Sequence, residues 1–192
     1  MEQLQRLEKE LESQFDELTP ESVQALTLAE FLYRYHGWML HDYAAVISGY
    51  ARAVEVQLKQ CLLPKVRKWI QAYGAVNELG RRWIRAGNDR IYKDARFTFG
   101  TWSTLFDEEK PHNYRLTAGE FYYCIHKEYG ATISFGNLSK FGKLLNELRK
   151  LRNLASHEVV NDWSKVRRAR EILFVEKLFN LLSSTTGSMF AS

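Results

Sequence analysis

Apolar residues near the start of the chain recur at intervals of three and four positions in a charged background. This periodicity is typical of an amphipathic helix, and its members are Leu4, Leu7, Leu11, Phe15 and Leu18. The pattern predicts a helix that docks on the rest of the protein. The alternative is a short coiled coil, or a linker to a partner outside this chain.

A second helix is predicted to begin at Thr19 and Pro20. A threonine side chain accepts hydrogen bonds from the free amides at a helix start, and proline is tolerated at the first helical position. Gly37 is predicted to end this helix, because glycine is frequent just beyond a helix C-terminus.

A third and longer apolar series predicts a helix from about His41 to Leu63, which Pro64 should kink or end. Its apolar face consists of Tyr43, Val46, Ile47, Tyr50, Val54, Leu58, Cys61 and Leu62. Residues 65–96 are mixed in character, and we expect short helices and an exposed basic surface there.

The rest of the chain continues the helical pattern. Two shorter helices are predicted over 97–106 and 117–129, separated by a loop. A further apolar stripe consists of Leu138, Phe141, Leu145, Leu148 and Ala155. The last helix is predicted over 164–182, and it should bury Val166, Ile172, Leu173, Val175, Leu178, Phe179 and Leu182.

No strand alternation is visible, so the sequence predicts an all-α bundle of four to five main helices. We expect an N-terminal helical extension over residues 1–36, the bundle over 37–183 and a flexible tail over 184–192.

Composition and charge narrow the class of protein. The 192 residues are 45% hydrophobic and 14% aromatic, which supplies enough apolar area for a core without a disulfide or metal. The net charge of +4 is uneven: residues 1–30 hold 2 basic and 8 acidic side chains, which leaves 25 basic and 15 acidic beyond them. A basic body of this kind can attract phosphate polyanions.

Cysteine use and hydropathy suggest a location. Cys61 and Cys124 are far apart and form no CxxC pair, so neither a zinc site nor a disulfide framework is expected. No apolar run approaches the roughly 20 residues that a membrane span needs. We therefore expect a cytoplasmic protein that does not enter a membrane, with no metal and no cofactor.

Two possible motifs are set aside. The stretch from Gly136 to Leu144 mimics a phosphate-binding loop, but it has one residue too many between its glycines and Leu in place of the hydroxyl residue. His36 and His41 flank Trp38 and Met39 without a carboxylate placed as in a helical zinc site, which predicts ordinary aromatic packing.

One segment carries a more specific pattern, Arg152-Asn153-Leu154-Ala155-Ser156-His157. With 15 Arg, 8 Asn and 5 His in the chain, about 0.016 occurrences of Arg-Asn-x3-His are expected by chance. Arg152 also occupies the next position of the apolar stripe after Leu148, where an arginine needs an anionic or carbonyl partner.

Helical geometry constrains what this segment can do. Asn153 and His157 are four residues apart and share a helix face, so Asn153 could orient the imidazole. Arg152 and His157 diverge by about 140° on a regular helix. They converge only if the helix bends or another subunit contributes. The structural alternative pairs Arg152 with Glu55 or Glu158 and uses His157 to cap the helix end.

The segment resembles the Arg-(four to six residues)-His motif of HEPN domains, in which Asn commonly follows the Arg. The likeness of helical layout covers about residues 38–182, including a helix with Glu55. The resemblance implies a HEPN-like bundle with Arg152 and His157 as a catalytic pair and with Asn153, Ser156 and Glu55 as supporting polar residues. Val159 stands where toxins paired with nucleotidyltransferase antitoxins have Tyr, so regulation through that Tyr is not expected.

Active members of this family are metal-independent endoribonucleases, often toxins or antiviral effectors, and they dimerise so that two motifs line one cleft. The resemblance therefore implies an RNA substrate, a homodimer, and an antitoxin or a larger effector as a further partner. An imidazole has an ordinary pKa of about 6.5 and can exchange a proton with a ribose 2′-hydroxyl at neutral pH. A guanidinium group offers a fixed fork of donors to phosphate.

RNA would be held by basic side chains in two windows, 59–96 and 140–170. The residues expected to contact it are Arg149, Lys150, Arg81, Arg82 and Arg85. A solvated helix surface explains such charge runs equally well. Two other functions stay open: a non-catalytic helical module that binds RNA or protein, and a regulator that binds a nucleotide without cleavage.

Overall fold

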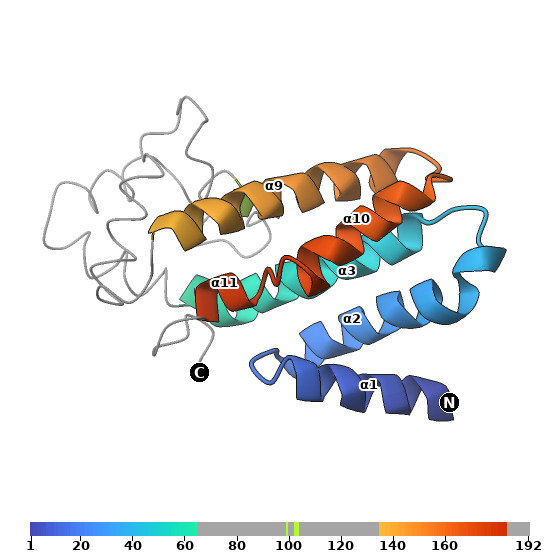
Figure 1. Ribbon diagram of the computed structural model, residues 1–192, viewed down its shortest axis with the longest axis horizontal. Helices are drawn as coiled ribbons and strands as arrows, with labels where there is room; N and C mark the ends of the chain where they lie inside the picture. Colours follow the sequence, from blue (N-terminus) through green and yellow to red (C-terminus); the bar gives the residue numbers. More distant parts are fainter. Residues whose placement is uncertain (65–98, 100–101, 104–134, 184–192) are drawn as a thin grey trace, which may run out of the picture. The chain divides into compact units, whose positions relative to one another are not determined.

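The computed structural model describes residues 1–64, 99, 102–103 and 135–183 (Figure 1). The all-α fold class is confirmed, because every element in these residues is helical and none is a strand. The elements are α1 (Glu2–Gln14), α2 (Pro20–Phe31), the π-helix η1 (Leu32–His36), the 3-10 helix η2 (Gly37–Met39), α3 (Ala44–Gln57), the π-helix η3 (Leu58–Leu62), α9 (Phe135–His157), α10 (Trp163–Phe174) and α11 (Asn180–Ser183).

The chain divides into two compact units. The first contains residues 1–57 and 147–179, and the second contains 58–146 and 180–192. In the first unit α1 packs on α2, α2 on α3, and α3 on α10. Figure 1 shows α1 and α3 antiparallel to α2, which lies between them. Described core residues of the second unit include Leu62, Trp102 and Phe141.

The N-terminal helix packs on the rest of the first unit, as the sequence interpretation of a docking helix predicts. Leu7, Leu11 and Phe15 are buried, and the Phe15 ring meets the Phe174 ring edge-on at 5.5 Å. The helix itself ends at Gln14. Residues 1–36 therefore pack in one unit with α3 and α10.

The loop from α1 to α2 is fixed by a buried glutamine. Gln57 of α3 accepts a hydrogen bond from the Thr19 amide at 2.9 Å and donates one to the Glu17 carbonyl at 3.0 Å. The Thr19 side chain accepts from the Ser22 amide and Pro20 occupies the first turn, so the predicted start of α2 is confirmed. A buried amide that meets both a donor and an acceptor leaves neither end unsatisfied.

The predicted last helix is wrong in one respect, since it breaks after Phe174. Lys177 adopts a left-handed φ of 53°, and the Leu178 amide donates to the Ile172 carbonyl at 3.2 Å. A single left-handed residue turns the chain out of the helix. Val175, which the periodicity places inside, is consequently 69% exposed.

The centre of the first unit is a buried carboxylate. Glu30 of α2 is fully buried and accepts hydrogen bonds from the Tyr50 hydroxyl at 2.5 Å, from Arg170 Nε at 2.7 Å and from Arg34 Nε at 2.8 Å. Arg34 continues to Glu10 of α1 at 2.9 Å. One network thus joins α1, α2, η1, α3 and α10, and a buried charge is tolerated because it is paired and hydrogen-bonded.

Electrostatics keep the Tyr50 hydroxyl and the Arg170 guanidinium in their hydrogen-bonding forms. Burial and the adjacent charge of Glu30 raise the pKa of the Tyr50 hydroxyl, which therefore stays protonated and donates. Burial lowers the pKa of Arg170, but the hydrogen bond and charge of Glu30 outweigh it and the net shift is upward. The Arg170 guanidinium also lies over the Phe174 ring, with its central carbon 4.6 Å from the ring centroid.

We predict that Glu30→Gln lowers the free energy of unfolding by about 3 kcal/mol, because an amide nitrogen would face the donors of Arg34 and Arg170. Glu10→Gln removes the half-exposed end of the same network and should cost less than about 1 kcal/mol. Urea unfolding of the two variants measures the difference. Equal losses would show that burial of Glu30 does not set the strength of the network.

Candidate functional site

The Arg152–His157 segment forms the C-terminal end of α9. The helix remains α-helical through His157, so the bend that would bring Arg152 and His157 together within one chain is absent. Five residues along a regular helix correspond to a rotation of about 140°. Within one chain, the two side chains therefore project from different faces of α9.

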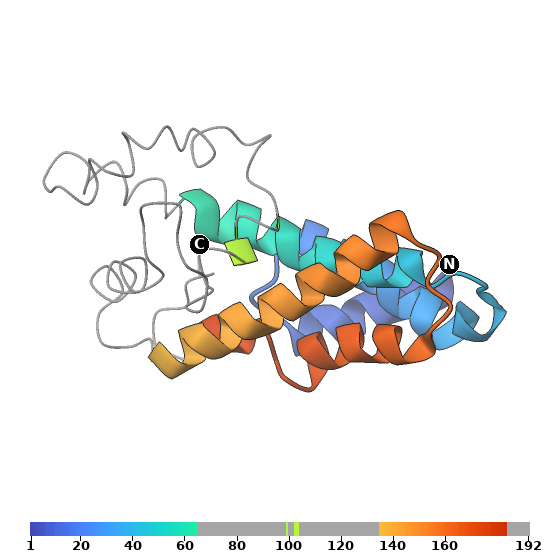
Figure 2. The same cartoon turned by 90° about the horizontal axis from the view of Figure 1, so that it is seen from above.

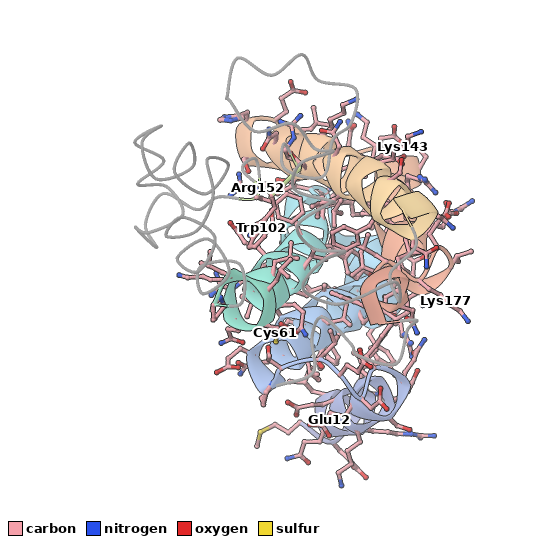
Figure 3. The ribbon with its side chains drawn as sticks, turned by 90° about the vertical axis from the view of Figure 1, so that its left-hand side faces the viewer. Glu12, Cys61, Trp102, Lys143, Arg152 and Lys177 are labelled. Atoms are coloured by element: carbon pink, nitrogen blue, oxygen red, sulfur yellow. The ribbon has the colours of Figure 1, made fainter. Side chains whose placement is uncertain are left out.

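The polar side chains of this segment differ in exposure. Asn153, Ser156 and His157 are exposed, whereas Arg152 is half-buried and extends from α9 (Figure 3). The Ser156 hydroxyl donates to the Arg152 carbonyl at 2.9 Å. It is therefore used to satisfy a backbone carbonyl in the last turns of the helix.

Arg152 and His157 have no side-chain partner among the described residues. There, neither Arg152 nor His157 forms a side-chain hydrogen bond or an ion pair, and this includes the pairings of Arg152 with Glu55 or Glu158. Asn153 forms no hydrogen bond to the imidazole either. Glu55 lies half-buried on α3, and no bond in the described part of the chain joins it to the segment.

Arg168 on α10 shows what a structural arginine in this unit looks like. Its Nε and Nη2 donate to the two carboxylate oxygens of Glu147 on α9 at 2.7 and 2.8 Å. The hydrogen bond from Arg168 holds the pKa of Glu147 below its usual range, and Glu147 in turn raises the pKa of Arg168. This paired geometry ties α9 to α10, and Arg152 has no equivalent.

The predicted RNA-contacting residues are only partly described. Lys150 is exposed and Arg149 half-buried on α9. Arg81, Arg82 and Arg85 lie outside the described residues. The structure therefore places two of the five on the helix that carries the motif.

A clamp fixes the segment that follows His157. The Tyr43 amide donates to the Val160 carbonyl at 2.7 Å, and Asp42 Oδ1 accepts from the Val160 amide at 2.9 Å. The same oxygen accepts from the Ala44 amide at 2.9 Å, at the start of α3. Asp42 thus joins the α9–α10 loop to α3. The sequence interpretation missed it, although an aspartate two residues before a helix is a recognisable cap.

The first turn of α10 is also capped by an aspartate. Asp162 Oδ1 accepts from the Ser164 hydroxyl at 2.6 Å and from its amide at 2.9 Å. The Ser164 side chain and backbone bonds hold the pKa of Asp162 below its usual range. Together the two aspartates define the path of the chain from His157 into α10.

The aromatic packing expected at His36 and His41 is found at His36, whereas His41 and the two residues that the histidines flank are exposed. Trp38 is 82% exposed and Met39 54% exposed. Of the two histidines, His36 does contact an aromatic ring, that of Phe31 at 5.1 Å. The neighbouring Gly37 lies against Trp163, which stacks on Tyr33 at 4.8 Å.

Comparison with protein-family models, with curated proteins and with solved structures finds no match to this chain. Among the described residues, no three His, Cys, Asp or Glu side chains are grouped to hold a metal ion. No helix in the same residues has the length and apolarity needed to cross a membrane.

We predict that Asp42→Ala destabilises the unit by about 1–2 kcal/mol and removes hydrogen-exchange protection from the Val160 amide. Asp42→Asn keeps an acceptor oxygen and should retain most of both. Amide exchange measured by NMR, together with urea unfolding, checks the result. A Val160 amide that stays protected in Asp42→Ala would contradict the clamp.

Proposed function

We propose that this chain is a metal-independent endoribonuclease of HEPN type that acts as a homodimer, with Arg152 and His157 as its catalytic residues. The observation that carries the proposal is that Arg152, in the same motif as His157, has no carboxylate partner among the described residues. Arg34, Arg168 and Arg170 are all paired with carboxylates, whereas Arg152 has none among the described residues. A half-buried guanidinium without a protein partner favours an anionic ligand.

The proposed reaction needs only these two side-chain types. A neutral imidazole takes the proton of the ribose 2′-hydroxyl, and the 2′-oxygen attacks the adjacent phosphorus. The bond from phosphorus to the 5′-oxygen breaks, and that oxygen receives a proton from an imidazolium. Arginine donates to the phosphate oxygens as negative charge develops on them. The products are a 2′,3′-cyclic phosphate and a 5′-hydroxyl, and the internal nucleophile makes a metal-bound water unnecessary.

The continuous α9 helix supports a dimer as the active species. Arg152 and His157 of one chain point about 140° apart, so a single copy does not present both to one phosphate. Two copies related by a two-fold axis could present the arginine of one and the histidine of the other. The same proposal includes a cytoplasmic role as a toxin or antiviral effector, restrained by an antitoxin or by a larger assembly.

The competing function is a helical module that binds RNA or protein without cleaving it. The divergence of Arg152 and His157 on one helix favours this alternative if the chain does not dimerise. Sedimentation of the purified protein therefore accompanies every activity measurement.

We predict that the wild type cleaves single-stranded RNA in EDTA, and that Arg152→Ala and His157→Ala each lower kcat by about 100-fold or more. The cleavage products should carry a 2′,3′-cyclic phosphate. Arg6→Ala is the matched control, because Arg6 is an exposed arginine of the same unit that lies on α1, outside both basic windows, and it should change kcat by less than about threefold.

Two results would remove the nuclease assignment. One is a folded, dimeric wild type that leaves RNA intact. The other is equal cleavage by wild type, Arg152→Ala and His157→Ala. RNA binding without cleavage would support the competing function, and saturable binding of a mononucleotide alone would support a regulator.

A further inference from the structure

Trp38 presents an almost fully exposed indole at 82% of its possible surface. Tryptophan has the largest apolar side chain, and leaving it in water forfeits a large burial free energy. Trp102, by contrast, is completely buried in the second unit. An exposed indole on an ordered turn is typical of a surface that binds a ligand.

The backbone around Trp38 is fixed by its neighbours. The chain passes from the π-helix η1 into the 3-10 turn η2, where the Leu40 amide donates to the Gly37 carbonyl at 3.4 Å. A Cβ atom at Gly37 would lie 2.6 Å from Cη2 of Trp163. The turn is therefore seated directly on the Trp163 ring, and Trp38 projects from a well-packed base.

That base is shared with the segment that follows the catalytic motif. The ring of Trp163 stacks on Tyr33, with 12° between the ring planes, and meets Tyr43 edge-on at 5.0 Å. Tyr43 is also bonded through its amide to Val160, three residues after His157. Figures 1 and 2 show η2 and the C-terminal end of α9 at the same end of the first unit.

The charges at this end select the class of ligand. Lys150, Arg152 and Arg167 carry positive charge and have no ion pair among the described residues. The carboxylates at the same junction are those of Asp42 and Asp162, which accept backbone hydrogen bonds, and that of Glu158. Cations attract phosphates, and a free indole face stacks on an unpaired base. A single strand of RNA offers both groups, whereas a duplex hides the faces of its bases.

We propose that Trp38 is a stacking platform for an unpaired base of the RNA whose phosphate is held at Arg152 and His157. This inference rests on the proposed function and deepens it, because it restricts the substrate to RNA that is single-stranded next to the cleavage site. Stacking tolerates every base, so Trp38 selects strandedness and not sequence.

The test uses a fluorescein-labelled single-stranded RNA with 2′-O-methyl riboses, which cannot be cleaved, and the full-length protein. We expect Trp38→Ala to raise the Kd about tenfold and Trp38→Phe to raise it less than about threefold, since phenylalanine keeps an aromatic face. Val175→Ala is the matched control, because Val175 is 69% exposed and follows the C-terminal end of α10, away from Trp163 at the N-terminal end. The Kd of this variant should equal that of the wild type.

The same RNA annealed to its complement gives a second readout. Trp38→Ala should bind this duplex as the wild type does, because no base face is free. An equal Kd of wild type and Trp38→Ala on the single strand would overturn the inference, as would a wild type that does not bind it. Loss of the wild-type sedimentation mass in Trp38→Ala would assign the indole to a protein interface and also overturn it.

The nuclease proposal and the stacking-platform proposal can be refuted independently of each other. If Arg152→Ala abolishes cleavage but Trp38→Ala binds normally, only the platform is wrong. If no cleavage occurs while single-strand binding depends on Trp38, the chain is a binding module, and the platform stands as its RNA contact.

Discussion

The buried carboxylate of Glu30 is the interaction on which the first unit depends. A charge without access to water is stable only if donors surround it, and here those donors come from three different segments: η1 supplies Arg34, α3 supplies Tyr50 and α10 supplies Arg170. Each donor is separated from Glu30 by a different length of chain. Satisfying the carboxylate therefore fixes the relative positions of these segments more narrowly than apolar packing does, because hydrogen bonds are directional.

This constraint extends to the candidate site through α10. Arg170 anchors the helix at Glu30, and Arg168, two residues earlier, binds Glu147 of α9 in a bidentate pair. The helix that carries the motif, α9, is thus bound to α10, and α10 is in turn bound to the buried carboxylate of Glu30. At the other end of α10, Asp42 clamps the loop after His157 to α3. The end of α9 is positioned from both sides, while the side chains of Arg152, Asn153 and His157 form no hydrogen bond among the described residues.

The candidate site and the exposed indole have a common physical origin. Among the described residues no carboxylate pairs with Arg152, and the turn that carries Trp38 lies on the Trp163 ring with the Trp38 indole left exposed. Both groups give up stability that the fold could have used. Proteins accept such costs mainly where a ligand repays them, which is the common basis of the proposed cleavage site and the proposed stacking platform.

Local pattern determined the all-α class, the docking face of α1, the Thr19 and Pro20 start of α2 and the motif itself, because helix periodicity, capping and spacing are properties of neighbouring residues. It did not determine the turn at Gly37 and Trp38, the Asp42 clamp or the Glu30 network. These depend on which distant groups meet: Gly37 with Trp163, Asp42 with Val160, Glu30 with Arg170. Only the tertiary structure decided that Arg168 is paired with a carboxylate and that Arg152 has no such partner in the described part of the chain. The partner of Arg168 lies 21 residues away in the sequence, and a contact over that distance cannot be recognised from neighbouring residues.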